Sequence, residues 1–221
     1  MTVETLTSRD IPPIRTDATI AEVLPQFATH HVQHLPLVDF EGCYLGVLSE
    51  DILRNVFDPD VLVDSFRREA PVSVGAGTHP LEAVRLMQRH HLTLLPVTRE
   101  GGTFDGVIAQ KDLFEYFSDQ LSAEASGSIL VIECAARDYS VSQLAYLFEQ
   151  HEARILSIFT HTPAGTDSRC LITIKTDVTD TARIRYLLAH HGYTLTAYFC
   201  EETTEEDLQD RVDEFLHYLA L

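Results

Sequence analysis

The first part of the chain alternates between short apolar runs and amphipathic stretches. After Thr19, which suits a helix N-cap, apolar residues recur at helical spacing through Phe27. Glu41-Gly42 then separates two short apolar runs, as a hairpin turn does. The pattern predicts the order strand, helix, strand, strand, helix. The predicted segments are a strand at Ile14, a helix from Ile20 to Phe27, strands His34–Val38 and Tyr44–Ser49, and a helix Asp51–Phe57.

The same pattern recurs sixty residues further along the chain. Over Glu22–Val47 and Glu82–Val107, 8 of 26 positions are identical without a gap. These are Glu22/Glu82, His30/His90, His31/His91, Leu35/Leu95, Pro36/Pro96, Gly42/Gly102, Gly46/Gly106 and Val47/Val107. The second copy predicts a strand Val72–Val74, a helix from Pro80 with Leu81, Val84 and Met87 inward, strands Leu94–Thr98 and Thr103–Ala109, and a helix Lys111–Phe117. Internal repetition of this kind indicates two copies of one structural unit.

A different order follows the Ser/Ala-rich stretch Ser118–Gly127. The predicted segments are strand Ile129–Cys134, helix Val141–His151, strand Arg154–Thr160, loop His161–Ser168, strand Cys170–Lys175, helix Thr181–His191 and strand Tyr193–Cys200. This βαββαβ order is a ferredoxin-like topology. The last residues, 203–221, predict an amphipathic helix, with an apolar stripe at Leu208, Val212, Phe215, Leu216 and Leu219.

Charge and composition narrow the function classes. The 221 residues carry a net charge of −18 at a pI near 4.8, with 14 Arg and 2 Lys. Such an acidic surface argues against nucleic acid and against anionic membranes as partners, and it is also typical of a salty habitat. The four cysteines form no CxxC pair, the start of the chain does not read as a signal peptide, and no apolar run reaches a membrane-spanning length. We expect a cytoplasmic protein with reduced thiols.

The repeat carries a family resemblance. The segments "LPLVD…LGVLSEDIL" and "LLPVTREGGTFDGVIAQKDLF" each resemble a CBS motif, and two such motifs in tandem resemble a Bateman module. The resemblance places motif 1 at residues 1–57, a linker at 58–69 and motif 2 at 70–125. It implies an α/β (α+β) fold built as a CBS-domain pair.

The resemblance also implies a ligand site at the end of each repeat. There the family reads Gly, apolar, apolar, Ser/Thr, x, x, Asp, and binds AMP, ATP or S-adenosylmethionine through the hydroxyl and the acid. Repeat one keeps Ser49, but its acid, Asp51, comes one residue early. Repeat two keeps Asp112 but has Ala109 in place of the hydroxyl, and Lys111 could replace it as a phosphate partner. The candidate nucleotide-binding residues are Ile14, Ser49, Asp51, Val72, Val74, Lys111 and Asp112. The alternative is that both acids only favour a helix N-terminus.

Residues 128–202 resemble an ACT domain, because "RDYSVSQLAYLFEQHEARILSI" is similar to the opening of that family. ACT domains bind amino acids at a dimer interface, beside a glycine that follows the first strand. Tyr139-Ser140 occupies that turn here, so a packing and dimerisation role is the alternative. A CBS pair followed by an ACT-like domain resembles the acetoin-utilisation B type of regulatory protein.

No motif points to catalysis or to a metal. The pairs His30-His31, His90-His91 and His190-His191 each end a predicted helix, where imidazole interacts favourably with the helix dipole. Neighbours on a helix point about 100° apart, so one pair makes a poor chelate. The chain has no GxSxG, P-loop, GxGxxG or HExxH.

The sequence therefore predicts a non-catalytic, ligand-sensing regulatory protein that needs no cofactor. The regulatory ligand would be an adenine nucleotide or S-adenosylmethionine in the CBS cleft, and the protein would form a homodimer that modulates an unknown partner. The alternative is a ligand-free structural adaptor or dimerisation scaffold that binds a protein partner.

Overall fold

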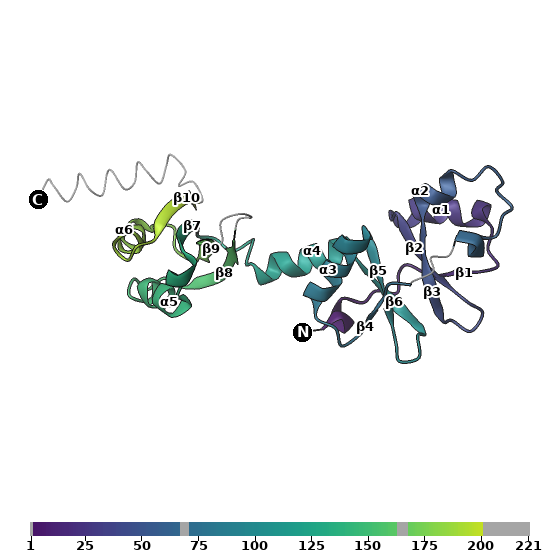
Figure 1. Cartoon of the computed structure of the whole chain (residues 1–221), viewed down its shortest axis with the longest axis horizontal. Helices are drawn as coiled ribbons and strands as arrows, with labels where there is room; N and C mark the ends of the chain where they lie inside the picture. Colours follow the sequence, from purple (N-terminus) through teal and green to yellow (C-terminus); the bar gives the residue numbers. More distant parts are fainter. Residues whose placement is uncertain (1, 67–70, 163–167, 201–221) are drawn as a thin grey trace, which may run out of the picture. The chain divides into compact units, whose positions relative to one another are not determined.

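The computed structural model describes residues 2–66, 71–162 and 168–200. The chain divides into two compact units, Met1–Tyr116 and Phe117–Leu221 (Figure 1). The division falls inside the helix α4, which spans Gln110–Gln120. Each unit is described by itself.

The first repeat forms a small mixed sheet with two helices. Its elements are β1 (Ile14–Arg15), α1 (Ile20–His30), β2 (His34–Val38), β3 (Tyr44–Ser49) and α2 (Glu50–Arg54). The strand β1 runs parallel to β2, and β2 is antiparallel to β3. Thr19 caps α1 as predicted, because its hydroxyl accepts from the Glu22 amide while the Glu22 carboxylate accepts from the Thr19 amide. The predicted helix through Phe57 is too long, because α2 ends at Arg54. Phe57 is fully exposed, so another helical turn would gain no stabilisation from burying this side chain.

The second repeat copies the first with the same strand pairing. Its elements are β4 (Val74–Gly75), α3 (Pro80–His90), β5 (Leu94–Thr98), β6 (Phe104–Ala109) and α4. The pair Ile14 and Leu37 in repeat one becomes Val74 and Val97 in repeat two, a shift of sixty at both positions. The prediction that Leu81 faces inward is wrong. The buried stripe of α3 is Pro80, Ala83 and Met87, which leaves Leu81 60% exposed.

Backbone hydrogen bonds join the two repeats at their hairpin tips. The Tyr44 amide donates to the Gly102 carbonyl over 2.9 Å, and the Phe104 amide donates to the Gly42 carbonyl over 3.0 Å. The two bonds are related by the same shift of sixty. The first unit is therefore one body built from two like halves.

Segments outside the repeats also pack on them. The N-terminal segment, with the 3₁₀ helix η1 (Val3–Leu6), exchanges two hydrogen bonds between Ser8 and Val107. The predicted linker 58–69 is partly structured over its described residues. It contains the 3₁₀ helix η2 (Val63–Phe66), buries Val63 completely, and accepts the Ile20 amide on the Val61 carbonyl.

The second unit has the element order predicted from its sequence. It contains β7 (Ser128–Ala135), η3 (Ala136–Asp138), α5 (Val141–Glu149), β8 (Ile155–His161), β9 (Arg169–Thr176), α6 (Ala182–His190) and β10 (Thr194–Cys200). The strands form one antiparallel sheet in the order β10-β7-β9-β8. Both helices cover one face of this sheet (Figure 1). The core between sheet and helices includes Leu130, Ile132, Leu144, Phe148, Ile172, Ile174, Ile184 and Leu188.

The predicted C-terminal helix, 203–221, lies outside the described residues. Among the helices that the structure describes, none combines the length and apolar character needed to span a membrane.

Candidate functional site

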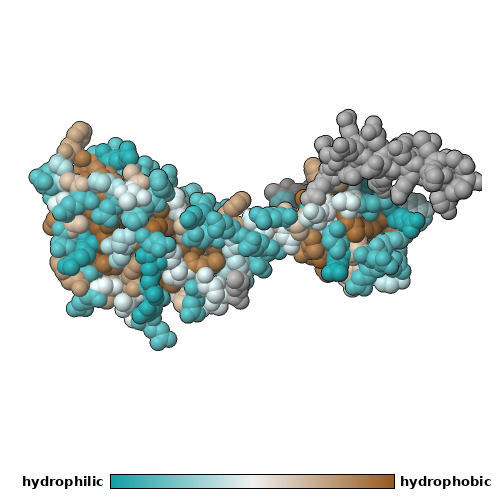
Figure 2. Space-filling model, turned by 180° about the vertical axis from the view of Figure 1, so that it is seen from behind, coloured by the Kyte–Doolittle hydropathy of each residue, from teal (hydrophilic) through white to brown (hydrophobic). Residues whose placement is uncertain are grey.

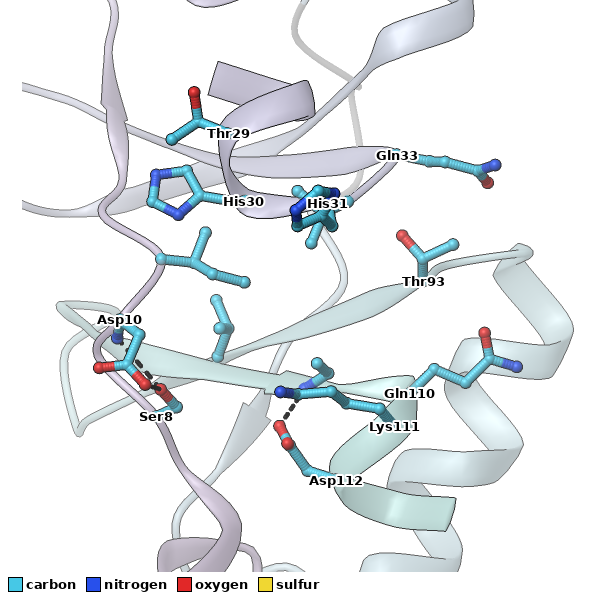
Figure 3. A pocket seen from close by; sticks show the side chains of 14 residues that line it. Ser8, Asp10, Thr29, His30, His31, Gln33, Thr93, Gln110, Lys111 and Asp112 are labelled. Atoms are coloured by element: carbon cyan, nitrogen blue, oxygen red, sulfur yellow. Dashed lines mark hydrogen bonds between the residues drawn. The ribbon is translucent and has the colours of Figure 1, made fainter. Parts of the chain in front are cut away.

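The described residues of the first unit form two related clefts, and each combines the end of a helix from one repeat with the start of a helix from the other. The first cleft has a volume of about 870 Å³. The end of α1, with His30 and His31, forms one side, and the start of α4, with Lys111 and Asp112, forms the opposite side (Figure 3). Its lining residues are Ser8, Asp10, Ile11, Thr29, His30, His31, Val32, Gln33, Thr93, Val107, Ala109, Gln110, Lys111 and Asp112.

The second cleft is formed by the equivalent positions of the two repeats, with their roles exchanged. His90 and His91 of repeat two take the place of His30 and His31. Its volume is about 580 Å³, and the end of α3 faces the start of α2. Its lining residues are Gln33, His34, Ser49, Asp51, Arg89, His90 and His91. The candidate residues named from the sequence therefore separate into two sites: Ser49 and Asp51 in the second cleft, Lys111 and Asp112 in the first.

The three apolar candidates lie elsewhere in the first unit. Ile14 and Val74 are buried in the short parallel strands β1 and β4, where they pair with Leu37 and Val97. Val72 uses its carbonyl to accept the hydroxyl of Tyr44 over 2.9 Å. None of the three lines either cleft.

Two of the three histidine pairs, His30-His31 and His90-His91, line the clefts, a placement that the sequence reasoning missed. His31 and His91 are the C-caps of α1 and α3, both in the left-handed region with φ of 54°. At each of these two residues the backbone turns from the helix toward the following strand. This turn brings the imidazoles beside the helix start of the other repeat. The available signal was their identity in the two repeats, since His30-His31 and His90-His91 coincide after the shift of sixty.

Local hydrogen bonds differ between the two acids. The Asp112 carboxylate accepts from the Ala109 amide through Oδ2 over 3.0 Å, which caps the start of α4 and leaves its other oxygen available to the cleft. The carboxylate of Asp51 and the hydroxyl of Ser49 make no hydrogen bond among the described residues. The alternative that this acid favours a helix N-terminus therefore accounts for one of the two oxygens of Asp112.

The N-terminal segment contributes lining residues to the first cleft. Asp10 accepts a hydrogen bond from the Ser8 hydroxyl over 2.9 Å, and both residues line the cleft. Next to them Arg9 contacts Asp105 at 2.6 Å, and Arg99 contacts the same oxygen at 2.6 Å. The hydrogen bond from Arg99, and then that from Arg9, lower the pKa of the Asp105 carboxyl. This ion-pair cluster fastens the segment to β6.

The geometry defines a class of fold, with paired clefts between two like halves. No group of three or more His, Cys, Asp or Glu in the described part of the chain could hold a metal ion. The family comparison agrees with this class. The CBS domain model matches residues 3–58 and 63–119, and the chain belongs to the CBS domain family.

Known relatives share this part of the chain. The inosine-5'-monophosphate dehydrogenase of Halalkalibacterium halodurans is 30% identical over 107 residues, 48% of this chain and 22% of the relative. This chain thus spans about a quarter of the length of such dehydrogenases. A CBS domain-containing protein of Dictyostelium discoideum is 25% identical over 128 residues, 51% of this chain and 88% of the relative.

A solved structure shares the fold. A CBS domain pair/ACT domain protein from Thermotoga maritima has a TM-score of 0.51 at 24% identity, covering 55% of this chain and 99% of that one. The structure and the comparisons together establish a mixed α/β fold with a tandem CBS pair.

Proposed function

We propose that this protein is a non-catalytic regulatory protein that binds an adenosyl ligand of the AMP, ATP or S-adenosylmethionine class in the first cleft. The carrying observation is that Lys111 and Asp112, at the start of α4, face His30 and His31 across a cavity of about 870 Å³. That volume falls within the range of small-molecule pockets, roughly 300–1,000 Å³. The ligand class itself comes from the resemblance to Bateman modules.

The two residues at the start of α4 would divide the work of recognition. The free oxygen of Asp112 would accept from a ribose hydroxyl, a charge-assisted hydrogen bond. Lys111 would hold a phosphate as a compact positive charge. The imidazoles of His30 and His31 would present further donors from the opposite side of the cleft.

Binding would act on a partner by shifting the geometry of the two repeats. A ligand held between α1 and α4 contacts both halves of the first unit, so it stabilises the arrangement in which both sets of contacts form. The shift is limited by the difference in the ligand's affinity for the two states.

Thermal unfolding tests this proposal. The panel contains AMP, ADP, ATP, S-adenosylmethionine and NAD, each at millimolar concentration, with common amino acids for the second unit. A ligand at 100 times its Kd adds about 2.7 kcal/mol to the free energy of unfolding. That corresponds to a rise of roughly 5–11 °C in Tm at this size. A flat response to every adenosyl compound would contradict the proposal.

One observation favours a second candidate, a ligand-free adaptor or dimerisation scaffold. Neither repeat joins a hydroxyl to an acid at the family spacing. Three residues after Ser49 the acid position holds Ile52, and three residues before Asp112 the hydroxyl position holds Ala109. Large apolar side chains are also exposed on the first unit, with Phe40 at 68% and Phe114 at 74%, and apolar surface is visible between polar areas (Figure 2). A co-purifying protein together with no ligand response would favour the scaffold.

We extend the proposal to the whole chain as a cytoplasmic homodimer with an unknown protein partner. The second unit would be an ACT-like domain, supported by its βαββαβ order and by the strand order β10-β7-β9-β8. The turn after β7 carries Tyr139 and Ser140, and the Ser140 hydroxyl caps α5 by accepting from the Gln143 amide. This occupied turn supports packing and dimerisation over amino-acid binding. Sedimentation of the full chain would measure the oligomeric state.

A further inference from the structure

Two cysteines face one another inside the second unit. Cys134 in β7 and Cys170 in β9 are direct register partners on neighbouring antiparallel strands. Both belong to the helix-covered side of the sheet, where their exposed fractions are 7% and 6%. Both are free thiols. The strands thus hold a pair of thiols at one point of the core.

The strand geometry brings this pair within reach of a covalent bond. Directly opposed residues of an antiparallel pair have Cα atoms about 4.5–5.5 Å apart. That range lies inside the span of about 4.4–6.8 Å seen across disulfides. In antiparallel strands in general, the Cβ atoms of directly opposed residues lie about 4.5–5.5 Å apart, whereas a disulfide needs roughly 3.5–4.5 Å. Bond formation would therefore draw the strands together by about 1 Å.

The position of the pair makes such a movement local. Only one further register pair, Ala135 with Arg169, lies between the cysteines and the ends of β7 and β9. The inward shift can be taken up there without displacing the rest of the sheet. A disulfide closed under strain is reduced more easily than a relaxed one, which suits a reversible modification.

We propose that Cys134 and Cys170 form a reversible intramolecular disulfide, which makes the second unit sensitive to hydroperoxides. Both S–H bonds and the O–O bond of the hydroperoxide break, one S–S bond forms, and the two thiol protons form new O–H bonds on the two oxygens of the hydroperoxide. The two sulfurs are oxidised together by two electrons, and the hydroperoxide is reduced to an alcohol and water. The product links β7 and β9, the two central strands of the sheet.

The surroundings of the pair set its reactivity. The Cys170 thiol donates a weak hydrogen bond to the Leu171 carbonyl over 3.8 Å. Burial raises the pKa of the Cys134 thiol, and the neighbouring Cys170 raises it further. Because the thiolate is the reactive form, oxidation is slow at neutral pH and accelerates as the pH rises. The exposed Cys200 is not subject to this burial.

The test uses the full-length chain with Cys43→Ser and Cys200→Ser, so that only the pair remains. Hydrogen peroxide is added, and intact mass and peptide mapping follow the product. The expected result is a loss of about 2 Da, a linked peptide joining Cys134 to Cys170, and full reversal by dithiothreitol. The rate should rise by up to about tenfold per pH unit between pH 7 and 9.

A third change, Cys134→Ala, is the matched control and should abolish the 2 Da loss. Circular dichroism checks that this variant folds, and if it does not, the linked peptide in the parent decides the question. Two thiols that remain open to alkylation after prolonged exposure to peroxide at pH 9, where the proposal predicts the faster reaction, would overturn the proposal. A disulfide between two chains in place of the internal one would also overturn it.

Discussion

The imidazole Nδ1 of His34 accepts a hydrogen bond from the backbone amide of Thr93 over 3.2 Å and lies 3.0 Å from the hydroxyl oxygen of the same residue. Because Nδ1 accepts from the amide, the neutral ring carries its proton on Nε2. His34 belongs to repeat one and lines the second cleft, whereas Thr93 belongs to repeat two and lines the first. One side-chain contact therefore joins both the repeats and the clefts.

Replacing this histidine should weaken the first unit. His34→Leu places at this position the residue type that repeat two has at Leu94, but it removes the acceptor for the Thr93 amide. A part-buried donor left without a partner costs about 1–3 kcal/mol in the free energy of unfolding. Urea denaturation measures this loss. His161→Leu, at an exposed position in β8, is the control and should stay within about 0.5 kcal/mol of the wild type.

The approach of the N-terminal segment to β6 depends on Gly106. A Cβ atom there would lie 2.5 Å from the Ser8 carbonyl oxygen and 2.7 Å from Cγ2 of Thr7. Gly106→Ala should therefore displace the segment, at a cost of about 1–3 kcal/mol, and speed hydrogen exchange at the Ser8 and Val107 amides. Gly77→Ala is the matched control, because a Cβ at that position meets nothing within 4 Å. Equal exchange rates in the two variants would contradict this packing.

The ion-pair cluster around Asp105 gives a pH dependence with a definite sign. The Asp105 pKa is lowered in the folded state, so the stabilisation is fully present above the unfolded value of about 4 and is lost as the pH falls through the folded value. Both arginines are well exposed, which limits the effect to less than about 1 kcal/mol and makes it sensitive to salt.

The measurement compares the free energy of unfolding of the wild type and Asp105→Asn between pH 6 and pH 2. The difference between the two proteins should shrink as the pH falls below about 4. Asp60→Asn, at an exposed position, is the control. A difference that stays constant over this range would show that the carboxylate charge contributes nothing.

The sequence predicted the elements more reliably than the site. The identities at positions such as Pro36/Pro96 and Gly46/Gly106 record a shared strand and turn geometry, so both repeats and their strand order could be predicted. Helix boundaries depend on burial instead. The apolar character of Leu81 predicts an inward position, but it does not say which face of α3 meets the core. The apolar character of Phe57 likewise predicts a longer α2, but Phe57 is exposed and the helix ends at Arg54.

The clefts could be predicted only in part. Lys111 and Asp112 follow a motif within one repeat, and that motif marks them as site residues. The partners opposite them, His30 and His31, come from the other repeat. Their placement depends on how the two halves meet, a relationship set by long-range contacts such as Tyr44 with Gly102. Spacing along the chain carries no record of it.

Titration with AMP by calorimetry tests the central claim most directly. The account predicts that Asp112→Asn, which keeps an acceptor for the Ala109 amide but loses the charge, weakens binding by about 10-fold or more. Asp51→Asn, in the second cleft, should leave that affinity unchanged. Equal affinities for the wild type and Asp112→Asn, or no binding of AMP, ATP or S-adenosylmethionine at millimolar concentration, would contradict the account.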